Sequence, residues 1–278
     1  MWIIWSFASA LFQTGTDVVT KRASYKTDVY LGAFVYQLLA MTTLVPFVIV
    51  SGIPPLKIGY WWGVLASVIS MPAWSLLYIY AIKTSPLSVT VPMLAFNPVI
   101  VALLSIVFDH RLPSVIGWLG IILICSGLYL LRLEKGVLRV DKGALAMLGV
   151  ALVWALGAHI NKILITASSP IFTAFTVTCI GSITLGIIAW LKGRMRVASV
   201  KDHLKHLTLP GMFQGLGEFT LMQAQDVGYT PYVISIKRMS MLFSSISGMV
   251  FFGESLSKNK AMGIVLMFIG VLLLINFP

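Results

Sequence analysis

The chain has 278 residues, of which 58% are hydrophobic and only 10% charged, and its mean hydropathy is +0.94. Soluble domains carry about 25% charged residues, so this composition excludes an ordinary soluble domain and indicates a chain whose solvent is lipid. The formal net charge is +11. Most Lys and Arg residues fall in short loops between apolar runs, which is typical of membrane proteins and argues against nucleic-acid binding.

The first apolar stretch, residues 2–20, has two interpretations. A signal peptide would carry basic residues before its apolar core and a small-residue cleavage site after it. Here Lys21 and Arg22 follow the run, and no basic residue precedes it. We therefore expect a retained first membrane helix.

Ten stretches qualify as membrane helices, because a spanning helix needs about 20 mostly apolar residues. Backbone polar groups in lipid must bond within their own segment, so the predicted fold class is an all-α integral membrane protein. The connections are short, and no segment is long enough for a soluble domain. The stretches are residues 2–20, 29–50, 60–82, 86–107, 115–133, 143–165, 170–191, 207–227, 231–252 and 261–277.

Two short segments that open a stretch are similar to one another. Phe108-Asp-His-Arg-Leu112 opens the fifth stretch, and Phe252-Gly-Glu-Ser-Leu256 opens the tenth. Chance similarity between apolar helices is the alternative explanation. Each of the two stretches also contains a pair of glycines at the same spacing: Gly120 and Gly127, then Gly263 and Gly270.

Further matches occur in the same order, and the stretch before Lys21 parallels the stretch before Lys162. The ordered matches favour duplication and predict two repeats, residues 1–135 and 136–278, of five helices each. Because five is odd, the second repeat enters the membrane from the opposite side. Inverted repeats with a binding site at their interface are a transporter architecture.

These motifs resemble the drug/metabolite transporter superfamily, in its EamA-type branch of ten-span transporters. The segment around Glu254 and the glycine-bearing last stretch carry the resemblance, and His110 stands where the family usually has Glu in the first half. Trp154-x-x-Gly157 followed by Lys162 resembles the family's repeat-opening helix.

Asn97-Pro98 resembles the helix-breaking proline of the family's fourth span, whereas the second half has Lys237-Arg238 instead of a proline. The resemblance covers essentially the whole chain. It implies two inverted five-helix repeats around a central cavity, and secondary active transport or exchange of a small solute. It does not indicate which solute.

Polar side chains within the stretches are costly in lipid, so we expect them to face protein or water. Residues three and four apart share a helix face, and several stretches carry polar stripes at that spacing. For serines, hydrogen bonds to their own helix are the alternative. The candidate solute-binding residues are Gln13, Trp74, Tyr78, Asn97, Gln214, Glu218, Met222, Lys237, Arg238 and Ser244.

Glu218 and Lys237 lie at comparable depth on two stretches joined by a short turn. Three hypotheses follow. They form a structural ion pair; or Glu218 releases its partner to take a proton or a solute amine; or Lys237 or Arg238 binds a solute carboxylate.

The candidate proton-coupling residues are Glu218, His159 and Asp17. The unperturbed imidazole titrates near neutrality, which suits a proton relay at His159, although an interfacial hydrogen bond is the alternative. For Asp17, an i,i+4 pair with Lys21 is the default expectation.

No phosphate loop, Ser/His/Asp set or clustered metal ligands occur in the sequence, so we predict neither an enzyme nor a cofactor, although Glu218, His159 and Asp17 would suit a membrane enzyme. The prediction is a secondary active exporter or exchanger of a small polar or amphipathic metabolite, such as an amino acid. The alternative is a non-transporting lipid-handling or assembly factor. Expected partners are the solute, membrane lipid and a coupling proton, with the chain a monomer or homodimer.

Orientation follows from the basic loops. Ten spans place both termini on one side, and loops on the opposite side hold most Lys and Arg, whereas Lys57, Arg111 and Lys162 fall on the terminal side. The positive-inside rule therefore predicts both termini outside the cytoplasm. We expect a multi-pass protein of a bacterial or archaeal cytoplasmic membrane.

Overall fold

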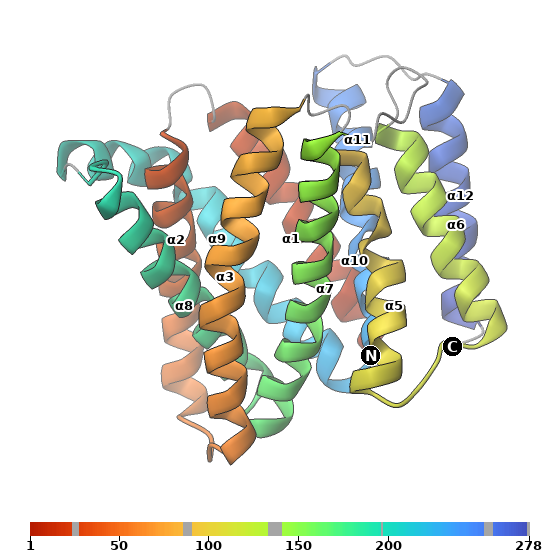
Figure 1. Cartoon of the computed structure of the whole chain (residues 1–278), viewed down its shortest axis with the longest axis horizontal. Helices are drawn as coiled ribbons and strands as arrows, with labels where there is room; N and C mark the ends of the chain where they lie inside the picture. Colours follow the sequence, from red (N-terminus) through yellow and green to blue (C-terminus); the bar gives the residue numbers. More distant parts are fainter. Residues whose placement is uncertain (24–27, 86–90, 133–140, 196, 253–257, 277–278) are drawn as a thin grey trace. The chain divides into compact units, whose positions relative to one another are not determined.

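The computed structural model describes residues 1–23, 28–85, 91–132, 141–195, 197–252 and 258–276. In these ranges every regular element is a helix, which confirms the all-helical fold class (Figure 1). The elements are α1 (Trp2–Ala23), α2 (Val29–Ser51), α3 (Ile58–Thr84), the 3-10 helix η2 (Val91–Phe96), α5 (Asn97–Phe108), α6 (Val115–Arg132), α7 (Lys142–Ala167), α8 (Pro170–Leu191), α9 (Val197–Val227), α10 (Thr230–Lys237), α11 (Met239–Phe252) and α12 (Lys258–Asn276).

Most helix boundaries fall close to those expected from hydropathy. α9 is the exception, because it begins at Val197, whereas the apolar stretch begins near residue 207. Hydropathy marks where a chain enters lipid, and a helix can continue beyond that point into a polar environment. The polar stretch 192–206 is therefore in part helical.

The predicted stretch 86–107 contains a break at Asn97. The 3-10 helix η2 ends at Phe96, and α5 begins at Asn97 with Pro98 in its first turn. Proline has no N–H and is accepted in a first turn, so it ends one helical piece and starts the next. The polar Asn97 is only 2% exposed at this break.

The stretch 231–252 contains a break at Arg238 without a proline. α10 ends at Lys237, and the backbone N–H of Arg238 lies 3.2 Å from the carbonyl oxygens of both Ile234 and Ser235. Such tightened bonds are common where a helix ends. α11 then starts at Met239.

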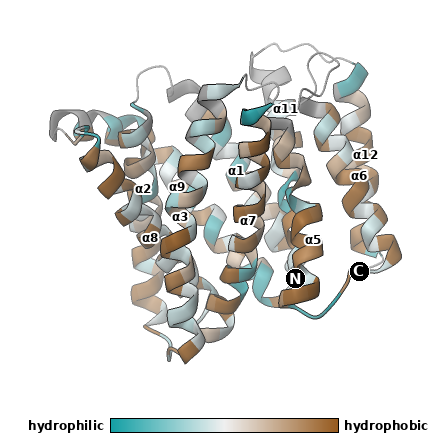
Figure 2. Cartoon of the chain, viewed as in Figure 1, coloured by the Kyte–Doolittle hydropathy of each residue, from teal (hydrophilic) through white to brown (hydrophobic). Residues whose placement is uncertain are grey.

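Three described helices are long and apolar enough to cross a membrane, namely Tyr30–Ser51, Lys142–Ala167 and Pro170–Leu191. Met93–Phe108, Val115–Leu130 and Ala261–Asn276 are apolar but shorter. Figure 2 shows hydrophobic residues along the helices, and many large ones are exposed, such as Val115 at 86%. This surface suits lipid, while the number of spans stays a prediction.

The described chain forms two compact units, and each takes residues from both predicted repeats. The first unit comprises residues 1–72 and 160–227, and the second comprises residues 73–159 and 228–278. The repeats 1–135 and 136–278 are thus not themselves the compact units. They stay a prediction about sequence ancestry.

In the first unit, α9 packs against α1, α2 and α8. One part of its core is formed by Leu44, Ile165, Ala174 and Met222. A second part is formed by Tyr60, Leu164, Ala167 and Val177.

In the second unit, α6 and α12 make a close backbone contact through glycines. A Cβ added to Gly120 would lie 2.9 Å from the carbonyl oxygen of Gly270, and one added to Gly127 would lie 2.5 Å from that of Gly263. Because Gly120 meets Gly270 while Gly127 meets Gly263, the two helices run antiparallel. Only residues without a side chain permit this approach.

Candidate functional site

Arg238 contacts residues of two other elements of the second unit. Its Nη2 donates to Oδ1 of Asn97 at 2.5 Å, so the break after α10 meets the break before α5. Nδ2 of Asn97 in turn donates to the carbonyl of Ala151 in α7 at 2.9 Å. The guanidinium carbon lies 5.6 Å from the centre of the Trp154 ring, within cation–π distance.

The Arg238 guanidinium retains unused hydrogen-bonding capacity. Nε of Arg238 is buried and has no hydrogen-bond partner among the described residues. No carboxylate in the described part of the chain pairs with Arg238. Because a desolvated cation without a counter-charge is costly, this geometry suits an anionic group brought by a ligand.

Two tryptophans extend this site. The ring centres of Trp74 and Trp154 lie 5.8 Å apart in an edge-to-face arrangement, and Tyr78 packs on the same apolar core. Three residues that the sequence predicts to bind solute are therefore connected: Trp74 contacts Trp154, Trp154 lies beside Arg238, and Arg238 binds Asn97. Lys237 and Ser244 lie in the same unit, on α10 and α11, and both are half-buried.

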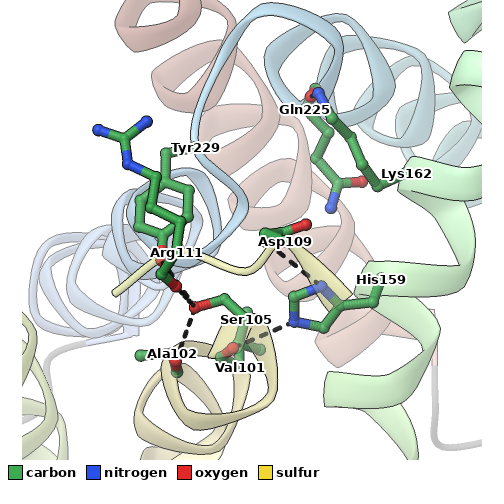
Figure 3. Close-up of polar contacts among 9 residues, drawn as sticks. All are labelled: Val101, Ala102, Ser105, Asp109, Arg111, His159, Lys162, Gln225 and Tyr229. Carbon is green, nitrogen blue, oxygen red and sulfur yellow. Dashed lines mark hydrogen bonds and ion pairs between the residues drawn. The ribbon is translucent and has the colours of Figure 1, made fainter. Parts of the chain in front are cut away.

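His159 forms a second polar site in the same unit. Its Nε2 lies 3.1 Å from the carbonyl oxygen of Val101 in α5, and its ring stacks on Phe108 with ring centres 4.9 Å apart. Its Nδ1 lies 3.7 Å from Oδ2 of Asp109, the residue that caps the end of α5. Figure 3 shows the imidazole with one nitrogen toward each of these oxygens.

A hydroxyl network joins the end of α5 to the start of α10. Oη of Tyr229 donates to the carbonyl of Arg111 at 2.8 Å and lies 2.7 Å from Oγ of Ser105 (Figure 3). The Arg111 guanidinium lies 4.8 Å from the centre of the Tyr229 ring. Burial raises the pKa of Tyr229, so this phenol stays protonated and acts as a donor at neutral pH.

The first unit holds a separate polar cluster on α1, α2 and α9. Nε2 of Gln13 donates to Oδ1 of Asp17 at 3.1 Å. Gln214 accepts from the Tyr36 hydroxyl at 2.7 Å and donates to Oε1 of Glu218 at 3.1 Å. Four predicted residues therefore lie in this unit as hydrogen-bonded pairs, each with a carboxylate.

Met222, also predicted to bind solute, is fully buried in the apolar core of the first unit. Lys162, from the repeat-opening motif, caps a helix. Its Nζ donates to the carbonyls of Gln225 and Asp226 at the end of α9. A cation at the negative end of a helix dipole is stabilising, which gives this lysine a structural role.

Some predictions lie beyond what the structure describes. Glu218 and Lys237 belong to different units, so their ion pair stays a prediction. The side chain of Lys21, the expected partner of Asp17, lies outside the described residues, as does Glu254. The role of every predicted site residue likewise stays a prediction.

Sequence reasoning missed Tyr36, Asp109 and Trp154 as site residues. Asp109 and Trp154 lie within the quoted motifs, but the motifs do not show which side chain each would meet. Tyr36 lies in an apolar stretch without a polar stripe. Among the described residues, no group of three or more His, Cys, Asp and Glu could hold a metal ion.

The amino-acid sequence matches the EamA-like transporter family over residues 1–133 and 141–276. The chain belongs to the EamA-like transporter family. The predicted resemblance is thereby confirmed, and this family places the chain among integral membrane transporters of the drug/metabolite transporter superfamily.

Two relatives of this EamA-like protein carry transporter names. An "Uncharacterized transporter" of Archaeoglobus fulgidus is 26% identical over 99% of this chain and 95% of its own length. The "Uncharacterized transporter YwfM" of Bacillus subtilis is 24% identical over 78% of this chain and 74% of its own. One crystal structure of a protein shares the fold, with a TM-score of 0.84 over 100% of this chain and 99% of that chain at 13% identity.

Proposed function

We propose that this transporter is a secondary active exporter or exchanger of small polar or amphipathic metabolites that carry a carboxylate, such as amino acids, and that it works by alternating access in a bacterial or archaeal cytoplasmic membrane. The observation that carries the proposal is the Arg238 guanidinium at the contact of two helix breaks. Its Nε is buried without a partner in the described chain. Guanidinium groups bind carboxylates in a bidentate manner, which satisfies several donors at once.

The positions of the helix breaks support a transporter mechanism. Discontinuous helices in corresponding positions of two repeats mark the binding sites of many transporters. Here the breaks at Asn97 and Arg238 fall in the fourth and ninth predicted stretches, which correspond under the proposed duplication. The side chains at these breaks are hydrogen-bonded to each other.

The α6–α12 contact supports inverted repeats. If Gly120 corresponds to Gly263 and Gly127 to Gly270, the contact of Gly120 with Gly270 becomes the symmetry mate of the contact of Gly127 with Gly263. Packing about a two-fold axis has this reciprocal form. It agrees with the proposal of ten spans in two five-helix repeats, residues 1–135 and 136–278.

The experiment is transport by the purified full chain in liposomes. Liposomes are loaded with unlabelled proteinogenic amino acids, the ¹³C-labelled mixture is added outside, and the label taken up is identified by mass spectrometry. We expect uptake of at least one amino acid above that of protein-free liposomes. No uptake of any amino acid would contradict the proposed substrate class, and pools of sugars and nucleotides would then test for transport of another class.

A further inference from the structure

The contact between His159 and Asp109 brings together two buried polar atoms that could share a proton. His159 is 1% exposed, and both its Nδ1 and Oδ2 of Asp109 are buried without a hydrogen-bond partner among the described residues. The Val101 carbonyl can only accept, so Nε2 of His159 carries the hydrogen of that bond. In a neutral ring Nδ1 is then a bare acceptor.

Two acceptors therefore face one another across 3.7 Å when the imidazole is neutral and the carboxyl is ionised. A single proton resolves this conflict, held either on Nδ1 as an imidazolium or on Oδ2 as a carboxylic acid. Without the proton, the pair would hold an uncompensated negative charge beside the buried ring.

The position of Asp109 favours such a shared proton. It caps the C-terminus of α5, where the helix dipole is negative and disfavours an anion. Arg111, a basic residue of the same loop, lies over the Tyr229 ring and forms no salt bridge with Asp109 among the described residues. Among the described residues, His159 is therefore the basic side chain paired with Asp109.

The pair also has a path for the proton. The Asp109 side chain is 22% exposed, whereas that of His159 is 1% exposed. The Asp109 carboxyl is therefore the side of the pair that water can reach. The stacked Phe108 ring and the Val101 carbonyl fix the imidazole. Other titratable groups close to this end of α5 include Tyr229 and His110, which directly follows Asp109 in the chain.

The helix α5 joins this pair to the Arg238 site. Asn97, which binds Arg238, is its first residue, and Asp109 follows its last. α7 contacts both ends of α5, through Ala151 at Asn97 and through His159 at Phe108. A change of charge at the Asp109 end of α5 thus acts on α5 and α7, the same two helices that position the Arg238 guanidinium.

We propose that Asp109 and His159 together bind one proton and form the coupling site through which the transporter exchanges a proton for its solute. The coupling role rests on the proposed function, whereas the proton site itself does not.

The proton site is tested first without solute. The chain has four histidines, so ¹⁵N-histidine NMR in lipid resolves them, and infrared spectroscopy reports protonated carboxyls. At about pH 7 we expect one proton in the pair: either Nδ1 of His159 is protonated, or a carboxylic-acid band is present that Asp109→Asn removes. A bare Nδ1 beside an ionised Asp109 would overturn the proposal.

The His159 signal is assigned by its loss in His159→Gln. If that variant does not fold, His110→Gln, His203→Gln and His206→Gln assign it by elimination. In Asp109→Asn the amide can donate to Nδ1, so we expect a neutral ring with its Nδ1 bare. An imidazolium that persists in this variant would show that Asp109 does not hold the proton with it.

The coupling role is tested in liposomes that contain a pH-sensitive dye, with the labelled amino-acid mixture as probe. We expect the mixture to move protons with wild type and with His206→Gln, an exposed histidine. Asp109→Asn and His159→Gln should lower this proton movement by a larger factor than they lower amino-acid exchange. Proton movement that is unchanged in both variants would overturn the coupling role. No amino-acid exchange by wild type would instead contradict the proposed function. In that case the NMR result still decides whether the proton site exists.

Discussion

Asn97 uses both ends of its amide, since Nδ2 donates to Ala151 and Oδ1 accepts from Arg238. Arg238 and Asp109 differ from it, because each has a buried polar atom without a partner in the described chain. Unsatisfied buried groups cost about 1–3 kcal/mol, so they persist where function requires them. The proposals for ligand and proton binding therefore rest on Arg238 and Asp109 rather than on Asn97.

The substitution Glu218→Gln should leave the pH profile of transport unchanged. Gln214 can still hydrogen-bond a glutamine at residue 218, and the coupling proton is proposed to lie on Asp109 and His159. The measurement is amino-acid exchange in liposomes as a function of pH. A pH dependence that disappears in this variant would instead place the coupling proton in the polar cluster of the first unit.

At the scale of helices, hydropathy and motifs predict much of the structure. The ends of α2 and α8 fall within a residue of the expected limits. The proline of Asn97-Pro98 indicates a helix break from the sequence alone. The break at Arg238 contains no proline that would reveal it in the sequence. It depends instead on the tightened last turn of α10. The His159–Asp109 contact depends on tertiary packing of α5 and α7, which no spacing rule supplies.

The substitution Gly127→Ala should destabilise the protein. The added Cβ would lie 2.5 Å from the Gly263 carbonyl oxygen, so α6 and α12 must separate. Overpacking of this kind costs about 1–3 kcal/mol. The measurement is thermal unfolding in detergent. Gly157→Ala is the matched control, because nothing lies within 4 Å of its added Cβ, and equal melting temperatures for the two variants would contradict the contact.

Asp141 precedes α7 and should stabilise this helix only at a pH at which its carboxyl is ionised. Its Oδ1 accepts from the backbone N–H of Ala144 at 2.9 Å, and this bond, with a further one from Ser85, lowers the pKa of the carboxyl. A depressed folded-state pKa gives stability that is present above the unfolded value, about 3.9, and is lost as the pH falls through the folded value.

Thermal unfolding of Asp141→Ala checks this. The melting temperature should fall at pH 7, and the difference from wild type should shrink below about pH 4, where the wild-type carboxyl becomes protonated. Asp141→Asn is the control, since Asn caps helices without titrating. A difference between wild type and Asp141→Ala that stays constant down to the lowest pH would count against the cap.

At the scale of the whole molecule, the chain crosses between its two compact units at residues 72–73 within α3, at 159–160 within α7 and at 227–228. Sequence repeats predict ancestry, whereas the units reflect which helices pack together, so hydropathy and motifs do not reveal them. The proline at the first crossing, Pro72, removes one backbone hydrogen bond and permits bending there. A bend in α3 at this crossing would suit the proposed alternating access.

The orientation of the whole chain is a further prediction. The excess of Lys and Arg in loops opposite to the termini places the C-terminus outside the cytoplasm. A tag at the C-terminus should therefore react with a membrane-impermeant reagent in intact cells. Labelling only after the membrane is permeabilised would place the C-terminus in the cytoplasm. It would contradict the predicted orientation, as expected if the number of spans were miscounted by one.

The most direct test of the account is whether Arg238 binds the carboxylate of the solute. The measurement is exchange of labelled amino acids in liposomes, with amino acids and their amides as competitors, for wild type, Arg238→Gln and the exposed control Arg194→Gln. We predict that acids compete better than amides for wild type and the control, and that Arg238→Gln lowers exchange at least about tenfold, equivalent to about 1.4 kcal/mol, and loses this preference. A folded Arg238→Gln that exchanges at the wild-type rate and still prefers acids to amides would contradict the account.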